Sequence, residues 1–285
     1  MSVNVTSSLN PTDYVNRFLN RSELLIGKAA ISRLKQKKVA IAGCGGVGGA
    51  TILTLARMGI GAFALADPGL FDEPDANRQW AASVETMGEN KARTYDRLVR
   101  AINPVVDIDC YPEGVTVANV KRFLRGADVF VDCMDVAIDP ELRQTTYEVA
   151  AEMGIYSIIT PILGFGALVV ASEPGGLPLT IFNRMMSSSI SSADLPPKLF
   201  EIFVPEHLMA LQESFKELKI PSVAIAPVIA AALAGTEVLM SLLDDSVAGW
   251  RPPLALPEVL AVDPMKLEFQ ILHLEDFLEA TPEKG

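Results

Sequence analysis

Short apolar runs alternate with longer amphipathic segments along the first half of the chain. The runs are rich in Val, Ile, Ala and Phe and are too short for helices, which is typical of buried strands. Strands are therefore predicted at residues 39–42, 63–66, 129–132 and 156–160, and a further strand is predicted at 107–111, where polar and apolar residues alternate. Between them apolar residues recur at helical spacing, and helices are predicted at 48–58, 91–102, 117–124 and 140–153. This alternation predicts an α/β fold with a doubly wound, mostly parallel Rossmann-like sheet.

The second half of the chain departs from this alternation. Residues 166–171 and 179–182 are predicted as adjacent antiparallel strands, because the turn Pro174-Gly175-Gly176 lies between them. A serine-rich stretch and Pro196-Pro197 then interrupt the pattern, and residues 184–220 are predicted to form a crossover loop that covers the substrate. The remaining expected elements are helices at 206–219 and 225–243 and a hairpin of strands at 259–263 and 268–273. Antiparallel strands are thus expected toward the C-terminus.

The N-terminal region has its own pattern. Residues 1–13 are polar and aperiodic, and they are predicted to form a flexible arm before a single domain of residues 14–285. Apolar positions recur at roughly helical spacing over residues 14–38, which are predicted to be helical. This segment carries Arg17 and Arg21, which as isolated charges are typical of a solvated helix face.

Composition narrows the classes of function. The chain has 285 residues and a formal net charge of −11, which disfavours a sequence-independent grip on nucleic acid. Its three cysteines form no C-x-x-C pair, so no structural zinc is expected and a reducing, cytoplasmic location is predicted. No signal peptide or membrane span is expected, because the apolar stretch 223–243 contains Pro, Gly and Glu and is better explained as a buried helix.

A glycine-rich turn follows the first predicted strand and leads into a helix. Its glycines occupy a G-x-G-G-x-G pattern at Gly43, Gly45, Gly46 and Gly48. Such a turn lets the backbone approach a phosphate closely, and the following helix N-terminus attracts the negative charge. Asp67 ends the second predicted strand, where an acidic side chain meets ribose hydroxyls in dinucleotide-binding folds. An oxidoreductase that binds NAD or FAD accounts for these features.

Two cations and a carboxylate favour a different chemistry. Arg78 lies just past the second predicted strand and Lys91 opens the next helix, so both are expected at the edge of the sheet that carries the glycine turn. Transfer of an adenylyl group needs such cations, because charge develops on the α-phosphate and the departing pyrophosphate. The fourth predicted strand ends at Asp132, interpreted as a helix cap, and Asp135 is predicted to bind Mg²⁺ together with substrate phosphates.

In this order and spacing, the motifs resemble the ubiquitin-activating-enzyme-like adenylyltransferases, the ThiF/MoeB/HesA group. The resemblance extends from about Arg17 to Leu243 and includes the glycine loop, Asp67, the Arg78-Gln79 pair, Lys91, Ile102-Asn103-Pro104, Asp135 and the segment from Ile220 to Glu237. It implies an ATP- and Mg²⁺-dependent enzyme that adenylates a carboxylate and releases pyrophosphate. The carboxylate would belong to a carrier protein, a peptide or a small molecule.

The resemblance also implies roles for individual residues. Arg78 and Lys91 would stabilise phosphate charge, Asp67 would bind ribose, and Asp135 would hold Mg²⁺. Further nucleotide contacts are expected from Asp75, Gln79 and Met134. The family's homodimers place an N-terminal arginine in the partner's site, and Arg21 and Arg17 are both candidates here.

Several positions depart from the family pattern. Asp75 and Val136 stand where the family has asparagine, and both zinc-binding C-x-x-C pairs are absent, as in the zinc-free branches. These changes leave open a catalytically degenerate member that only binds nucleotide. No cysteine follows Cys133, so capture of the activated acyl group by an amine or internal amide is favoured over an enzyme thioester.

Other residues receive structural interpretations. Cys44 and Cys133 are interpreted as packing residues, and His207 and His273 as surface or packing residues, so no histidine base is expected. A tRNA substrate, as in the threonylcarbamoyladenosine cyclase branch, is disfavoured by the acidic balance.

Overall fold

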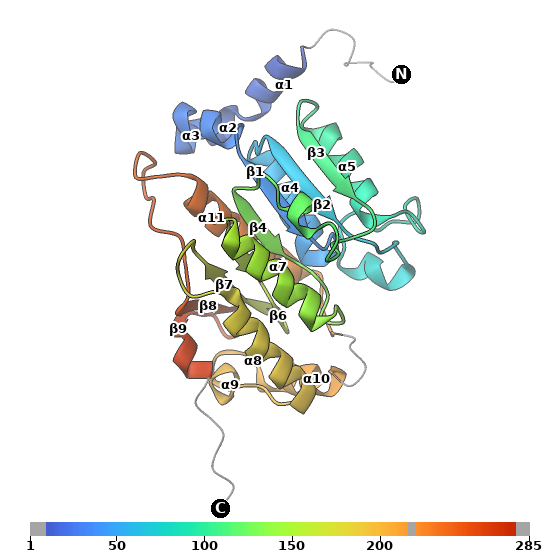
Figure 1. The fold of residues 1–285 in the computed structure, drawn as a ribbon, viewed down its shortest axis with the longest axis vertical. Coiled ribbons are helices and arrows are strands. Elements are labelled where there is room, and N and C mark those ends of the chain that lie inside the picture. The colour runs from blue at the N-terminus through green and yellow to red at the C-terminus, as the bar shows by residue number, and fades with distance from the viewer. Residues whose placement is uncertain (1–9, 216–219, 278–285) are drawn as a thin grey trace, which may run out of the picture.

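The computed structural model describes residues 10–215 and 220–277 (Figure 1). Within these ranges the strands form one nine-stranded sheet of order β3-β2-β1-β4-β5-β7-β8-β9, with β6 paired to β7. The strands are β1 (Lys38–Ala42), β2 (Ala62–Ala66), β3 (Asp107–Tyr111), β4 (Val129–Asp132), β5 (Tyr156–Ile159), β6 (Ile162–Leu163), β7 (Gly166–Ser172), β8 (Glu258–Asp263) and β9 (Glu268–His273). Neighbours from β3 to β5 are parallel, and the pairs from β5 to β9 are antiparallel. The predicted α/β class, with antiparallel strands toward the C-terminus, is confirmed.

Helices cover both faces of the sheet, except that α1–α3 lie beyond the end of the strands where β1 begins (Figure 1). They are α1 (Pro11–Phe18), α2 (Asn20–Ile26), α3 (Lys28–Leu34), α4 (Gly46–Arg57), α5 (Lys91–Ile102), α6 (Val120–Phe123), α7 (Pro140–Glu152), α8 (Leu179–Ser192), α9 (Pro197–Ile202), α10 (Pro205–Ser214) and α11 (Ile225–Leu242). Strand β1 shows why there are two cores. Val39 and Ile41 pack into the core shared with α4, α5 and α11, whereas Ala40 and Ala42 face the core shared with α7 and α8. Each fully buried Val or Ile contributes about 1.5–3 kcal/mol of hydrophobic free energy.

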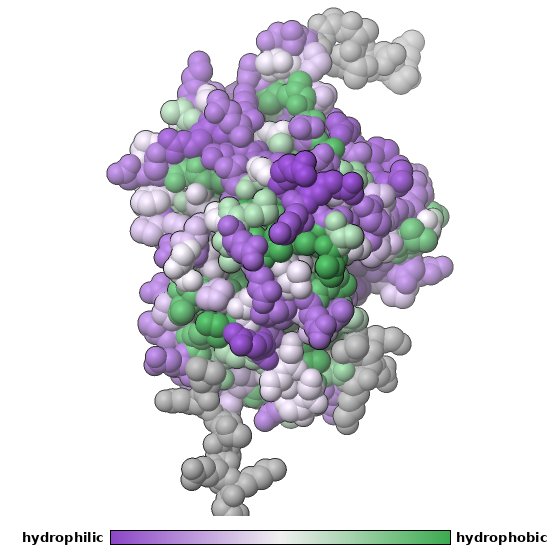
Figure 2. Space-filling model, in the orientation of Figure 1, coloured by the Kyte–Doolittle hydropathy of each residue, from purple (hydrophilic) through white to green (hydrophobic). Residues whose placement is uncertain are grey.

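The front of the molecule, over α7 and α8, is a mixture of hydrophilic and smaller hydrophobic areas (Figure 2). The apolar helix α11 is long and apolar enough to cross a membrane by length and composition alone, and half of its residues are buried. It packs against α4 and β7 in the core that also contains Val39 and Ile41 of β1, as a core helix of a folded domain does.

Two predictions about the C-terminal half are wrong. Residues 179–182 form the first turn of helix α8 and not a strand, because Leu179, Phe182, Met186 and Ile190 recur at helical spacing and pack on the core. The predicted crossover loop at 184–220 is largely helical over its described residues. Pro197 and Pro205 are the first residues of α9 and α10, a position where proline suits a helix because no N–H bond is lost there.

The N-terminal prediction also needs correction. Residues 1–9 lie outside the described residues, but helix α1 begins at Pro11, within the range predicted as a flexible arm. Asn10 caps this helix by accepting a hydrogen bond from the backbone N–H of Thr12 at 2.9 Å. The predicted helical segment of residues 14–38 is divided into α1, α2 and α3, with Gly27 at φ +86° between α2 and α3.

Candidate active site

The glycine loop connects β1 to α4 and has no room for side chains at two positions. Gly43 has a φ of +90°, and a Cβ atom there would lie 2.1 Å from the carbonyl oxygen of Cys133. A Cβ atom at Gly48 would lie 1.8 Å from the carbonyl oxygen of Gly43. The loop is therefore pressed between the ends of β1 and β4, and the backbone N–H groups of the first turn of α4 lie at this edge. This arrangement suits an anion such as a phosphate.

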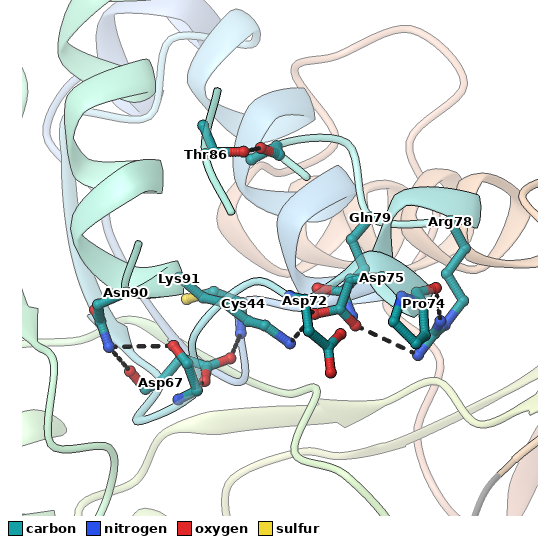
Figure 3. A network of polar contacts seen from close by, with 12 residues as sticks. Cys44, Asp67, Asp72, Pro74, Asp75, Arg78, Gln79, Thr86, Asn90 and Lys91 are labelled. Atoms are coloured by element: carbon teal, nitrogen blue, oxygen red, sulfur yellow. Dashed lines mark hydrogen bonds and ion pairs between the residues drawn. The ribbon is translucent and has the colours of Figure 1, made fainter. Parts of the chain in front are cut away.

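Asp67 lies next to the glycine loop. Its Oδ2 accepts a hydrogen bond from the backbone N–H of Cys44 at 2.6 Å, and its Oδ1 accepts one from Gly69 at 2.7 Å (Figure 3). Burial raises the pKa of Asp67, and these two N–H bonds oppose the rise. Each oxygen keeps a second lone pair, so the carboxylate can also accept a ribose hydroxyl.

Asn90, which is not among the predicted site residues, fixes the loop after β2. Its side-chain amide donates to the carbonyl oxygens of Asp67 and Gly69, at 3.0 and 3.2 Å. Its Oδ1 caps helix α5 by accepting from the N–H of Arg93 at 3.1 Å. An asparagine directly before a helical pattern is an N-cap signal that predicts this role. Asn90 thereby sets the position of Lys91, the first residue of α5.

Arg78, Gln79 and Lys91 gather at the same edge of the sheet (Figure 3). A Cβ atom added at Gly46 would lie 3.5 Å from the carbonyl oxygen of Arg78. A Cβ atom added at Gly45 would lie 3.7 Å from the Gln79 side chain. The Oε1 atom of Gln79 is buried and has no hydrogen-bond partner among the described residues. An acceptor left unpaired beside the loop fits a site that a ligand completes. Lys91 and Arg78 lie 2.9 and 3.8 Å from the carboxylate of Asp75, which also accepts a hydrogen bond from Gln79, so the two predicted phosphate-binding cations gather on the side of the loop where Gln79 lies.

Asp135 follows β4 on an exposed loop, and its Oδ1 accepts from the N–H of Ala137 at 3.0 Å. An exposed carboxylate fits Mg²⁺, which prefers one or two carboxylates and keeps several waters. Within the described residues, no group of three or more His, Cys, Asp or Glu side chains is gathered to hold a metal.

A buried ion pair supports the loop that carries Asp135. Asp132 is 1% exposed, and Nε of Arg143 lies 3.0 Å from its Oδ2. A terminal nitrogen of Arg143 donates to the carbonyl oxygens of Met134 and Asp135, at 2.7 and 2.9 Å. The N–H of Met134 donates to Asp132 at 2.8 Å, and the hydroxyl of Tyr147 also donates to Asp132. Asp132 thus anchors this loop and is not a simple cap of α7, which Asp139 caps.

The structure does not bring Arg17 and Arg21 to this edge. Both are exposed on α1 and α2, and the segment after them packs at the opposite edge of the sheet, where the N–H of Gly61 donates to the carbonyl oxygen of Leu34 at 3.2 Å. Strand β1, five residues long, separates the two edges by about 16 Å. Within one chain these arginines are remote from the glycine loop.

The cysteines and histidines have surroundings suited to packing. Burial raises the pKa of Cys44 and that of Cys133, so both stay as thiols at neutral pH. The ring of His207 stacks on Phe165 with a centroid distance of 5.4 Å, and its buried Nδ1 has no partner among the described residues. His273 is exposed.

The parallel part of the sheet has a glycine loop between its first strand and the following helix. An acidic residue stands at the end of its second strand, and two cations lie nearby. These features define a Rossmann-like nucleotide-binding fold. The chain belongs to the ThiF family, whose sequence model matches residues 19–280.

Individual relatives differ in how much of their length aligns with this chain. The chain is 30% identical over 122 residues to the adenylyltransferase and sulfurtransferase UBA4 of Candida albicans, which covers 43% of the chain and 27% of UBA4. It is 25% identical over 240 residues to the tRNA threonylcarbamoyladenosine dehydratase of Bacillus subtilis, covering 79% of the chain and 94% of that protein. The chain therefore spans about a quarter of one relative and nearly all of the other.

Among solved structures, that of E. coli MccB with ATP has a TM-score of 0.64 at 19% identity, covering 95% of this chain and 73% of that one. At this identity the likeness establishes the fold. The family match and the adenylyltransferase among the sequence relatives make the chain adenylyltransferase-like, and the predicted resemblance to the ThiF/MoeB/HesA group is confirmed.

Proposed function

We propose that this protein binds ATP and transfers its adenylyl group to a carboxylate, with release of pyrophosphate. The observation that carries the proposal is that Lys91 and Arg78 both contact the carboxylate of Asp75, at 2.9 and 3.8 Å, next to the Gln79 side chain that borders the glycine loop at Gly45. A dinucleotide cofactor needs no such pair, whereas the departing pyrophosphate does. The relatives named as adenylyltransferases support the same chemistry.

In the proposed reaction, a carboxylate oxygen attacks the α-phosphorus of ATP. The bond between that phosphorus and the oxygen bridging to the β-phosphate breaks, and the electron pair leaves on pyrophosphate. The N–H groups of the glycine loop hold the phosphates, Asp67 holds the ribose, and Arg78 and Lys91 stabilise the developing charge. Mg²⁺, held by Asp135, would neutralise phosphate charge when it is bound.

The acyl adenylate is proposed to react with an amine or amide, without an enzyme thioester. The raised pKa of both Cys44 and Cys133 supports this, because a thiol attacks only as its thiolate. Residues 184–220, largely helical over their described part, are proposed to cover a carrier C-terminus, a peptide or a small molecule. A tRNA remains the disfavoured candidate, since the net charge is −11.

We also propose that two copies form a homodimer in which Arg17 or Arg21 completes the partner's site. An apolar hollow of about 270 Å³ supports the dimer; it is lined by α4, α11 and Trp80, which is 63% exposed. Leu24 and Leu25 of α2 are also largely exposed, at 86% and 81%. The distance from the arginines to the glycine loop of their own chain favours action in trans.

Exchange of labelled pyrophosphate into ATP tests the proposed reaction. In the presence of Mg²⁺ and a panel of carboxylate peptides, the protein is expected to catalyse exchange with at least one of them. Lys91→Ala and Asp135→Asn are expected to lose exchange by about 100-fold or more, because each removes charge stabilisation in the transition state. Lys121→Ala, an exposed lysine on α6, is the matched control and should retain it.

Thermal-shift measurements separate the alternatives. Stabilisation by NAD or FAD but not by Mg-ATP would overturn the proposal in favour of an oxidoreductase. Tight ATP binding without exchange on any carboxylate would indicate a member that binds nucleotide and does no chemistry.

A further inference from the structure

The carboxylate of Asp75 is the point where the polar contacts beside the glycine loop meet (Figure 3). Its Oδ2 lies 2.9 Å from Nζ of Lys91, and its Oδ1 lies 3.8 Å from a terminal nitrogen of Arg78. Oδ1 also accepts a hydrogen bond from the side-chain amide of Gln79, and Oδ2 accepts one from the N–H of Asp72 at 3.3 Å. One carboxylate thus engages both cations assigned to the phosphates of ATP.

Asp75 is held in the charged form. It is 6% exposed, and although burial alone would raise its pKa, the hydrogen bond and charge of Lys91 keep the pKa below its usual value of 3.8. The stabilising contribution of the ion pair is therefore present above that usual value and is lost only as the pH falls through the lowered pKa. At neutral pH Asp75 is a buried anion with its partners in place.

Besides Asp75, the charge of Asp67 also acts on Lys91, whereas Arg78 has no other ion pair among the described residues. The ammonium of Lys91 lies between Asp75 and the ring of Phe71, at 5.6 Å from the ring centroid. Arg78 donates through one nitrogen to the carbonyl oxygen of Pro74 at 3.2 Å and to Oδ1 of Asn77 at 2.9 Å, both neutral acceptors. Any phosphate that uses these two cations must share them with Asp75 or displace it.

We propose that Asp75 is an internal counter-ion that competes with the triphosphate for Lys91 and Arg78, and thereby makes the protein select metal-complexed over metal-free ATP. The inference rests on the proposed function, because it assigns the two cations to phosphate. Metal-free triphosphate meets two cations that a carboxylate already neutralises in part. A divalent ion on the phosphates offsets the Asp75 carboxylate, which would otherwise repel the nucleotide. Asp75 is thus a specificity-determining residue for the metal state of the nucleotide.

The test compares ATP affinity by titration calorimetry, with Mg²⁺ and with a chelator, in the natural protein and in Asp75→Asn. Asparagine keeps an oxygen for the N–H of Asp72 and removes the charge. Glu73→Gln is the matched control, because it removes the same charge two residues away on the exposed side of the same 3₁₀ turn. Adenosine, which lacks phosphate, is the control ligand, and thermal unfolding checks that each variant is folded.

Asp75→Asn is expected to bind metal-free ATP about tenfold or more tighter than the natural protein. This gain in ATP affinity should be smaller when Mg²⁺ is present. The affinity of Asp75→Asn for adenosine and the ATP affinities of Glu73→Gln should equal those of the natural protein. Equal or weaker binding of metal-free ATP by folded Asp75→Asn overturns the inference. If the gain is seen but no carboxylate supports pyrophosphate exchange, the proposed function fails and the counter-ion role stands. If neither form binds ATP under any condition, both fail.

Discussion

At the scale of single residues, the site depends on positions where a side chain has no room. A Cβ at Gly48 would overlap the carbonyl oxygen of Gly43, at 1.8 Å, and would lie 3.1 Å from Cβ of Cys133. Gly48→Ala is expected to lower the free energy of unfolding by more than about 2 kcal/mol and to abolish ATP binding, because the loop must move. Urea unfolding and calorimetry measure the two effects.

Gly235→Ala is the control for this prediction. Gly235 is also helical, but the nearest atom to its added Cβ is Cγ2 of Thr54 at 3.6 Å, an ordinary contact. The substitution is expected to stabilise the protein by about 0.5–1 kcal/mol, since alanine favours a helix over glycine. An equal decrease in unfolding free energy in both variants would contradict the close packing of the glycine loop.

The ribose-binding role proposed for Asp67 predicts that the affinity for ATP depends on pH. Burial raises the pKa of Asp67 above its usual 3.8, so the carboxylate takes up a proton at a higher pH than an exposed aspartate. Because a protonated Asp67 accepts ribose hydroxyls less well, ATP affinity should fall as the pH is lowered through that raised pKa.

Inorganic tripolyphosphate serves as the reference ligand, because it has the titrating phosphates of ATP but no ribose. The ratio of ATP to tripolyphosphate affinity, measured by calorimetry across the acidic range, should decrease with falling pH. A ratio that stays constant with pH would contradict the proposal that Asp67 binds the ribose.

At the scale of elements, the loop after β4 is held by Arg143 from α7. Arg143→Met leaves Asp132 buried and charged without its cation, and is expected to cost about 3–5 kcal/mol of unfolding free energy. The double variant Arg143→Met with Asp132→Asn should be more stable than the single one, because no buried charge remains. Urea unfolding of both measures this, and a double variant no more stable than Arg143→Met would argue against the ion pair.

The parallel half of the fold could be predicted element by element, because β1, β2, β4 and β5 are mostly apolar runs and β3 alternates polar and apolar residues between helical segments. Helix α8 could not, because Leu179-Thr180-Ile181-Phe182 suits a strand locally, and only its packing on the core decides for a helix. The glycine loop, Asp67 and Lys91 could be placed from the order of strand ends. The supporting contacts of Arg143 could not, since they join residues from separate elements whose distance no sequence spacing gives.

At the scale of the whole molecule, the proposed dimer makes a prediction about assembly. Leu53 and Val228 contribute to the apolar hollow beside Trp80. Leu53→Asp is expected to shift the protein to a monomer in sedimentation equilibrium, because a carboxylate would be buried between the two copies. Leu267→Asp, at a residue 91% exposed in the β8–β9 turn, is the control and should leave the mass unchanged.

Mixing two inactive variants tests whether the arginine acts in trans. One variant carries both Arg17→Ala and Arg21→Ala, and the other carries Lys91→Ala. A dimer of either variant alone lacks a required residue in both of its sites. Mixed dimers contain one site with all residues present, so pyrophosphate exchange should partly return on mixing. Exchange that stays absent in a verified mixed dimer would contradict action across the interface.

Trp80 gives the protein an optical label of its own. The chain has two tryptophans, and the other one, Trp250, donates its indole N–H to the carbonyl oxygen of Met240 at 2.9 Å and is partly buried. Trp80 follows Gln79 and lies exposed in the hollow. Its fluorescence should therefore shift to shorter wavelength when a second copy covers it, while Trp250 provides a steady reference. Association can thus be followed in dilute solution without attaching a dye, and Trp80→Phe identifies which indole gives the signal.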